Sequence, residues 1–140
     1  KAKGILYDVA HVLKDARVNE EAGRWSCVEG NFFKNVPPGA DVYMLKRIIH
    51  DWKDDDCVTI LSNIRKVMSP GARILVCDCV IPPGNGPHGG KVLDVLMMSA
   101  LPGFERTQEE FAALFERAGL KLSRVIHTPA LLSITEAVAK

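Results

Sequence analysis

The sequence predicts an α/β protein whose sheet is mostly parallel and ends in an antiparallel hairpin. Three observations support this fold class. Short apolar runs alternate with segments in which apolar residues recur at helical spacing. The run Arg73–Val80 is almost continuously apolar, which is typical of a parallel strand covered on both faces. Two further runs near the C-terminus are joined only by His127–Ala130, and so short a link favours antiparallel pairing.

The predicted strands are short and are bounded by turn residues or charges. The first ends in an acid, Asp8, and the second, around Cys27, has the weakest pattern of the set. Their ranges are Gly4–Asp8, Trp25–Val28, Asp41–Lys46, Arg73–Val80, Lys121–Ile126 and Leu131–Val138. A chain of 140 residues organised in this way fits one domain.

Three segments between the strands have the apolar spacing of helices. The first follows Asp54 or Asp55, either of which can cap it, and it ends before the turn Pro70-Gly71. The second, Val92–Ala100, is apolar on nearly all sides, so we expect it to be buried or to contact a partner. The third begins at the capping box Thr107–Glu110.

Composition and charge argue against several classes of protein. The hydrophobic fraction of 47% and the charged fraction of 25% are ordinary for a soluble globular domain. A net charge of +1 provides no basic field for a nucleic acid, and no apolar run is long enough to cross a bilayer. The basic start Lys1–Gly4 soon meets further polar residues, so it is not a signal peptide. The cysteines and histidines lack metal-ligand spacing, which predicts reduced thiols, a cytoplasmic location and no metal site.

Three polar side chains follow predicted strands, which is where ligands bind in doubly wound folds. Asp8 ends the first strand, Asp78 lies near the end of the Arg73–Val80 strand, and His50 comes soon after the Asp41–Lys46 strand. An acid ending an early strand often accepts hydrogen bonds from ribose hydroxyls, although Asp8 could equally cap the following helix. From the pattern alone, His50 could be a loop histidine without a special role.

The segment Leu45–Trp52, with the sequence LKRIIHDW, carries the most specific part of a family resemblance. It resembles the catalytic domain of the caffeic-acid and hydroxyindole type of S-adenosylmethionine-dependent O-methyltransferases, which include bacterial polyketide-tailoring members. Weaker matches lie at Gly4–His11, Gly30–Phe33, Ile60–Ile64, Ile74–Pro82 and Glu105–Thr107. The resemblance covers essentially the whole chain. It implies a Rossmann-like methyltransferase sheet, of which residues 1–140 would be the later part of the cofactor-binding catalytic domain.

The resemblance implies S-adenosylmethionine as cofactor and names residues that would bind it. Asp8 would hold the ribose, Asn31 and Phe32 would flank the adenine, and Lys46 would line the site. Many members of the family have Asp where this chain has Asn31. An asparagine carbonyl can still accept a hydrogen bond from the adenine amino group, so we expect altered cofactor contact rather than its loss.

The resemblance also implies a catalytic site for a small hydroxylated acceptor, and we expect the enzyme to be a homodimer. His50 would be the general base, Glu105 would orient its ring, and Asp78 would bracket the ring from the other side. Met97 and Trp52 would line the acceptor pocket. Members of the family often have Glu where this chain has Asp78, and the shorter side chain puts its role in question.

Other functions remain open from the sequence. Gly84–Gly89 matches the G-x-G-x-x-G pattern of dinucleotide-binding oxidoreductases, with Glu105 at about the right distance for a ribose acid. However, Pro87 removes an amide that a pyrophosphate would need. The chain could also be a purely structural or dimerisation module, or keep the fold and cofactor but carry out a reaction other than methylation.

The beginning of the chain resembles the second strand of the family's sheet, the strand that ends in Asp8. The first strand, its glycine-rich turn and the helical N-terminal region of the family are not found in these residues. We therefore expect the 140 residues alone to be inactive. We also expect them to expose a long apolar sheet edge, and so to dimerise or to be part of a longer chain.

Overall fold

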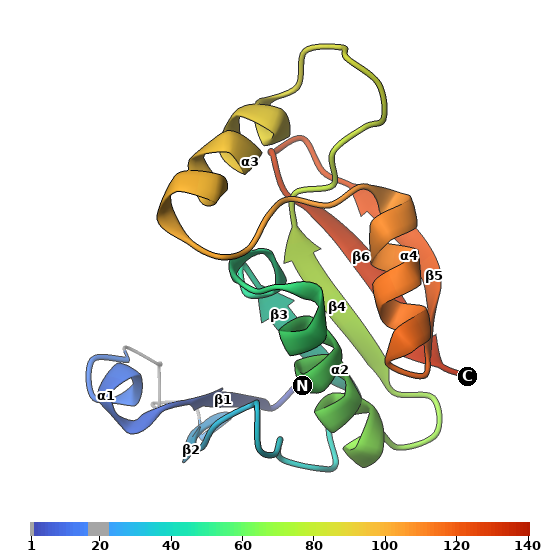
Figure 1. Ribbon diagram of the computed structural model, residues 1–140. Helices are drawn as coiled ribbons and strands as arrows, with labels where there is room; N and C mark the ends of the chain where they lie inside the picture. The colour runs from blue at the N-terminus through green and yellow to red at the C-terminus, as the bar shows by residue number, and fades with distance from the viewer. Residues whose placement is uncertain (1, 17–22) are drawn as a thin grey trace.

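The computed structural model describes residues 2–16 and 23–140, and its elements follow the predicted alternation of strands and helices (Figure 1). In chain order they are β1 (Gly4–Asp8), α1 (Ala10–Leu13), β2 (Trp25–Glu29), β3 (Val42–Lys46), the short 3₁₀ helix η2 (Ile49–Asp51), α2 (Asp54–Val67), β4 (Arg73–Asp78), α3 (Gly89–Ala100), α4 (Gln108–Arg117), β5 (Leu120–His127) and β6 (Ser133–Ala139).

The six strands of the described residues form two sheets. β1 and β2 make a two-stranded parallel sheet in which Asp8 lies opposite Glu29. The other four form a sheet in the order β3-β4-β6-β5, where β3 runs parallel to β4 while β6 pairs antiparallel with both β4 and β5. The α/β class, the parallel strands and the antiparallel C-terminal hairpin are thus confirmed. A single continuous sheet is not observed, because within the described residues β1 pairs only with β2, and β3 only with β4.

The helix boundaries follow local chemistry, with one correction. The residue that caps α2 is Lys53, whose backbone is extended, and not Asp54 or Asp55. These aspartates occupy the first turn instead, where negative charge is favourable next to the positive end of the helix dipole. The capping box at Thr107 is present as predicted, and Gly119 follows the end of α4 with a φ of 74°.

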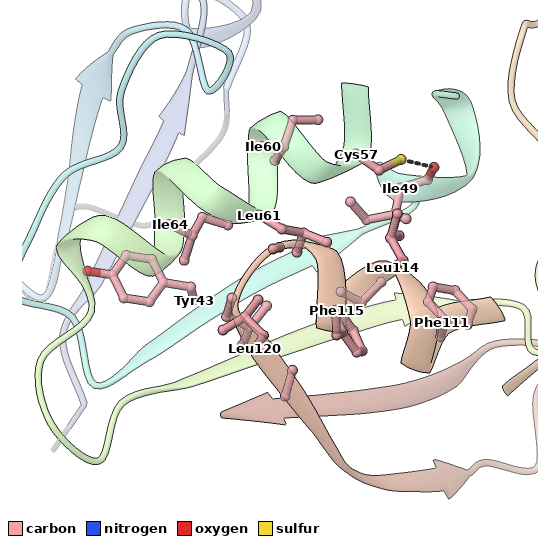
Figure 2. Close-up of a cluster of buried hydrophobic side chains, with 14 of the residues drawn as sticks. Tyr43, Ile49, Cys57, Ile60, Leu61, Ile64, Phe111, Leu114, Phe115 and Leu120 are labelled. Carbon is pink, nitrogen blue, oxygen red and sulfur yellow. Dashed lines mark hydrogen bonds between the residues drawn. The ribbon is translucent and has the colours of Figure 1, made fainter. Parts of the chain in front are cut away.

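The hydrophobic core lies between the four-stranded sheet and the two helices α2 and α4, which cover one of its faces (Figures 1 and 2). Its most deeply buried side chains come from both helices and from the strands: Ile60, Leu61, Ile64, Ile74, Val76, Phe111, Phe115 and Leu120. Because side chains alternate along a strand, Asp78 shares the helix-covered face with Ile74 and Val76. The core therefore ends in a buried acid at the carboxyl end of β4.

Helix α3 is packed much less closely than its composition suggests. Met97 is buried, but Val92, Val95, Leu96 and Met98 are exposed. The expectation that this helix is buried is therefore wrong for most of its apolar residues, and the alternative, contact with a partner, stays a prediction. No helix among the described residues is long and apolar enough to cross a membrane.

Candidate active site

His50 lies in η2, the turn that connects β3 to α2, and it is 4% exposed. The turn is reached through Arg47, whose φ of 54° is rare for a residue with a side chain. Arg47 donates its backbone N–H to the carbonyl of Cys77 on β4 at 3.1 Å. This hydrogen bond fixes the start of the turn beside the carboxyl end of β4, so that His50 and Asp78 lie near one another.

Glu105 bonds directly to the imidazole of His50. The distance between His50 Nδ1 and Glu105 Oε1 is 2.8 Å, and both side chains are buried. A carboxylate can only accept hydrogen bonds, so Nδ1 carries the hydrogen and Nε2 has the free lone pair of the neutral ring. Glu105 is itself held by its backbone N–H, which donates to Asp94 Oδ1 at 2.8 Å. The structure thus brings together the histidine and the carboxylate that the resemblance pairs.

The charges around His50 favour its protonated form. The hydrogen bond to Glu105 raises its pKa above the ordinary value, burial acts in the opposite direction, and the negative charge of Asp78 adds to the increase. Nε2 also lies 3.3 Å from Asp51 Oδ1, a contact that stabilises the imidazolium. His50 is therefore a stronger base than a histidine in water, with a smaller fraction in the free-base form at neutral pH.

Asp78 is 1% exposed, and neither of its carboxylate oxygens has a hydrogen bond of normal geometry to the described residues. Burial raises its pKa to about 6, against the opposing effect of the nearby His50. The strand predicted to run to Val80 ends at Asp78. Val80 forms one parallel bridge, with Arg106. Asp78 therefore lies near His50 as predicted, but it is an electrostatic neighbour and not a hydrogen-bonded partner of the ring.

The predicted cofactor residues lie at the carboxyl ends of β1, β2 and β3. Asp8 accepts a hydrogen bond from the backbone of Val9 through Oδ1 at 2.8 Å, and Oδ2 has no partner among the hydrogen bonds of the described chain. Asn31 uses its carbonyl oxygen to accept from the backbone of Phe33 at 2.9 Å. Lys46 ends β3 and is exposed.

A hollow of about 360 Å³ opens at the ends of β1 and β2, and of the predicted cofactor residues Asn31 is part of its wall. Its lining consists of Val9, Ala10, Glu29, Gly30, Asn31, Lys34 and Asn35. Carboxylate oxygens accept hydrogen bonds from hydroxyls, and a side-chain amide can both donate and accept. The donor and acceptor set at this edge therefore fits a ribose and a nitrogen-rich ring.

Phe32, Phe33 and Trp52 form one aromatic cluster, in which the rings of Phe32 and Trp52 also meet edge-on with 6.3 Å between centroids. The ring of Trp52 meets that of Phe33 edge-on with 4.7 Å between centroids, and the rings of Phe32 and Phe33 are 5.0 Å apart. Asn63 on α2 also donates to the carbonyl of Phe32 at 3.0 Å. The loop after β2 is thereby joined to the turn that carries His50, which links the predicted cofactor and acceptor sites.

The glycine-rich loop has a local structural role. His88 caps α3 by accepting from the backbone of Gly90 at 3.1 Å. Lys91 donates to the carbonyls of Gly84 and Gly86, the latter at 2.8 Å. The loop thus points carbonyl oxygens at the side chain of Lys91. A dinucleotide-binding loop instead points backbone N–H groups at a phosphate, so this loop does not have the arrangement that the pattern requires.

Two residues that shape the site had no role assigned from the sequence. Gly103 is buried so closely that a Cβ atom there would lie 1.9 Å from the carbonyl oxygen of His50. Arg106 is completely buried beside the turn. The only sequence signal for Arg106 is its place beside Glu105 in the matched segment Glu105–Thr107.

Comparisons with known proteins agree with this architecture. The sequence profile of a family described as an O-methyltransferase domain matches residues 1–121. The phenazine O-methyltransferase PhzM of Lysobacter antibioticus is 42% identical over 98% of this chain and 41% of its own length. The S-adenosylhomocysteine-bound crystal structure of CalO1, a methyltransferase of calicheamicin biosynthesis, is 46% identical with a TM-score of 0.93, and the match covers 99% of this chain and 42% of that one.

A third similar structure is described as a pericyclic reaction enzyme. It is 29% identical with a TM-score of 0.84, and the match covers 98% of this chain and 36% of that one. In each of these comparisons, the chain spans about two fifths of the length of the protein that it matches.

Proposed function

Because this chain belongs to the O-methyltransferase domain family, we propose that it forms the later part of the catalytic domain of an enzyme that methylates a hydroxyl of a small aromatic acceptor. The methyl donor is S-adenosylmethionine. The observation that carries this proposal is the buried pair of His50 and Glu105, 2.8 Å apart, in the turn after β3. Such a pair supplies the base that O-methylation of a phenol needs.

The chemistry explains why a buried histidine suits this reaction. A phenol titrates near pH 10, so roughly one molecule in a thousand is ionised at neutral pH, a deficit of about 4 kcal/mol. A positioned general base accelerates such a step by roughly 10²–10⁴-fold, which is of the same size. Glu105 keeps the hydrogen on Nδ1 of His50, so Nε2 accepts the acceptor's proton, and the carboxylate stabilises the imidazolium that forms.

The residues at the strand ends would bind the cofactor. Asp8 would accept hydrogen bonds from the ribose hydroxyls, Asn31 and Phe32 would contact the adenine, and Lys46 would line the site. When bound, the sulfonium supplies an electrophilic methyl group. The protein's own contribution is to align the acceptor oxygen with that group and to remove its proton.

The acceptor would bind on the side of Glu105 that faces α3. A groove of about 570 Å³ lies there, with apolar walls that include Met98, Leu101 and Phe104. We place Met97 and Trp52 in the same acceptor site as further apolar contacts, since Met97 is a buried residue of α3 and Trp52 follows the catalytic turn. Apolar side chains in a groove that also contains Glu105, the partner of His50, favour an aromatic acceptor over an aliphatic one.

We further propose that the enzyme is a cytoplasmic homodimer and does not bind nucleic acid. Exposed apolar residues on α3, Val92, Val95 and Leu96 among them, offer a surface for a second subunit. The net charge of +1 does not favour a polyanion.

The proposal is tested by incubating the full-length protein with S-adenosylmethionine and a panel of phenols. Mass spectrometry should find a product heavier by one CH₂ unit, together with S-adenosylhomocysteine. His50→Ala should lower turnover by roughly 10²-fold or more and leave cofactor affinity nearly unchanged. Equal turnover in the variant and the parent would remove His50 from the mechanism.

A second candidate function is a reaction that uses the fold and the cofactor without transferring the methyl group. The observation that favours it is the similarity to the structure described as a pericyclic reaction enzyme. The same experiment separates the two functions. Conversion of an added substrate without formation of S-adenosylhomocysteine would support the second.

A further inference from the structure

Arg106 is a fully buried arginine, 1% exposed, in the segment between α3 and α4. Arginine is almost never buried completely unless its charge is paired, because removing it from water costs several kcal/mol. The groups that surround its guanidinium must therefore be arranged to satisfy it, and they in turn are fixed by it.

The guanidinium donates to two carbonyl oxygens in the turn that carries His50. Nη1 bonds to the carbonyl of Ile49 and Nη2 bonds to the carbonyl of Trp52, both at 3.0 Å. One carbonyl belongs to the residue before His50 and the other to the second residue after it. The planar group thus spans the backbone of the turn from one side of the histidine to the other.

The charge of Arg106 is neutralised at the start of α2. Nη2 lies 2.8 Å and Nε 3.2 Å from the same oxygen of Asp54. The aromatic ring of Phe104 lies against the guanidinium, 4.1 Å from its central carbon. The arginine is therefore held by an anion and an aromatic face, while Nη1 and Nη2 each also donate to a carbonyl of the turn that carries His50.

The thiol of Cys57 contacts the same two carbonyls, at 3.3 Å from that of Ile49 and 3.5 Å from that of Trp52. Figure 2 shows the first of these bonds as a dashed line between α2 and the turn. On the other side, Gly103 packs against the carbonyl of His50 with no room for a side chain. The backbone of the turn is thus enclosed by residues 103–106 and by α2.

The position of Arg106 along the chain is also fixed. Val80, just beyond β4, forms a parallel bridge with it, and the backbone N–H of Ile81 donates to its carbonyl at 3.0 Å. Its neighbour Glu105 bonds to the imidazole of His50. Two consecutive residues therefore act on the same turn: Glu105 bonds to the ring of His50, and Arg106 bonds to the carbonyls of Ile49 and Trp52 on either side of it.

We propose that Arg106 is a positioning residue for His50: by fixing the carbonyls of Ile49 and Trp52, it sets the direction in which Nε2 faces the acceptor hydroxyl. This inference rests on the proposed function and adds to it a residue that contacts neither substrate. A base displaced by about 1 Å loses on the order of 10²-fold in rate, even when the displaced group is chemically intact. The role of Arg106 therefore concerns geometry and not the protonation of His50.

The test compares Arg106→Lys with Arg117→Lys in the full-length protein. Arg117 is a matched control because it also approaches Asp54, at 3.9 Å, but makes no contact with the turn. Lysine at position 106 keeps the positive charge but cannot donate to Asp54 and to both carbonyls, of Ile49 and Trp52, at the same time. In Arg106→Lys we expect kcat to fall by at least about tenfold, while the KM values for S-adenosylmethionine and for the acceptor stay within about threefold of the parent's. In Arg117→Lys we expect the parent's values of kcat and KM.

A second measurement does not depend on methyl transfer. In spectra of protein with nitrogen-15-labelled histidine, the ring signals of His50 should move in Arg106→Lys and stay in place in Arg117→Lys, at a temperature where melting curves show both variants folded. If Arg106→Lys does not fold, Asp54→Asn is measured in its place, because this variant removes the ionic contact of Arg106 and leaves its contacts with the carbonyls. In Asp54→Asn we expect a smaller fall in kcat and a smaller shift of the ring signals of His50. Unchanged kcat with unchanged ring signals in the folded variant would overturn the inference. Failure of the parent to methylate any phenol would contradict the proposed function instead, and the ring signals would still test the positioning.

Discussion

The turn that carries His50 and the pair of strands that carries Asp8 are built in contrasting ways. Around the turn, Ile49, His50, Glu105 and Arg106 are all buried and joined by hydrogen bonds that link distant parts of the chain. In the two-stranded sheet, no residue of β1, α1 or β2 is buried. Within these residues, the turn that holds the proposed base is thus placed by the hydrophobic core, whereas the residues proposed to bind the cofactor are placed mainly by one strand pairing.

This difference teaches how the two halves of the proposed reaction depend on the fold. A base needs a fixed direction and a controlled electrostatic environment, and both come from burial. A cofactor that lies along strand ends needs backbone and polar groups within reach, which a shallow edge can offer. The following variants test whether the catalytic side is the rigid one and the cofactor side the tolerant one.

The largest expected effect is on stability. Phe115 of α4 is fully buried against the core, so Phe115→Ala should lower the free energy of unfolding by about 3–5 kcal/mol. Ile5 of β1 is 49% exposed in these 140 residues, and in a protein of these residues alone Ile5→Ala should change that free energy by no more than about 0.5 kcal/mol. Urea denaturation measures both. Similar losses for the two variants would mean that β1 is as much part of the core as α4.

The next effect is on turnover and on its pH dependence. Glu105→Gln should lower kcat roughly 10²-fold, because glutamine cannot hold the imidazolium with a charge. His50 must be unprotonated to act as the proposed base, so kcat/KM should rise as the pH passes through the pKa of His50. The hydrogen bond to Glu105 is the main cause of the raised pKa of His50. In Glu105→Gln the midpoint of this rise in kcat/KM should therefore move to lower pH.

Asp78→Asn is the matched comparison for this variant. Asp78 has no hydrogen bond to the ring, so we expect a smaller loss of kcat, within about tenfold. Steady-state kinetics across a pH series decide the order of the two variants. A larger loss in Asp78→Asn would identify Asp78 as the carboxylate that orients His50.

The smallest effect concerns the cofactor edge. Asp8→Ala should weaken cofactor binding by about tenfold, which is the size of one hydrogen bond to a charged acceptor, while kcat at saturating cofactor stays within about threefold. Asp15→Ala, which removes an exposed carboxylate just after α1, is the control and should leave binding unchanged. Calorimetry with S-adenosylhomocysteine measures both. A loss of kcat without a loss of binding in Asp8→Ala would contradict the division between the two regions.

Much of the fold could be predicted because its signals are local. The continuous apolar run of β4, the capping box at Thr107 and the short link before β6 each depend on neighbouring residues. The division into two sheets could not be predicted, since strand pairing depends on residues far apart in the sequence. The sequence left open whether α3 is buried or contacts a partner for a related reason: an apolar composition shows that a helix can bury a surface, but not what covers it.

The candidate site was predicted in part. The segment that contains His50 and the acid at 105 could be identified, and the structure brings the two together. The lack of a hydrogen bond between His50 and Asp78 depends on how the fold orients the two side chains, which a sequence pattern does not record. Arg106 was missed because an arginine in a loop is usually solvated, and only the fold reveals that it is buried.

The left-handed backbone of Arg47 has a consequence for which amino acids can follow the end of β3. At a φ of 54°, glycine and asparagine are the residues that lose least, and a β-branched side chain meets the strongest steric conflict. In a library of all substitutions at this exposed position, the ranking of variants by stability would follow the backbone conformation, with glycine among the most stable and isoleucine and valine among the least stable. Tolerance at position 47 would thus be governed by the shape of the main chain leading into the turn that carries His50, and hardly at all by the charge that arginine brings.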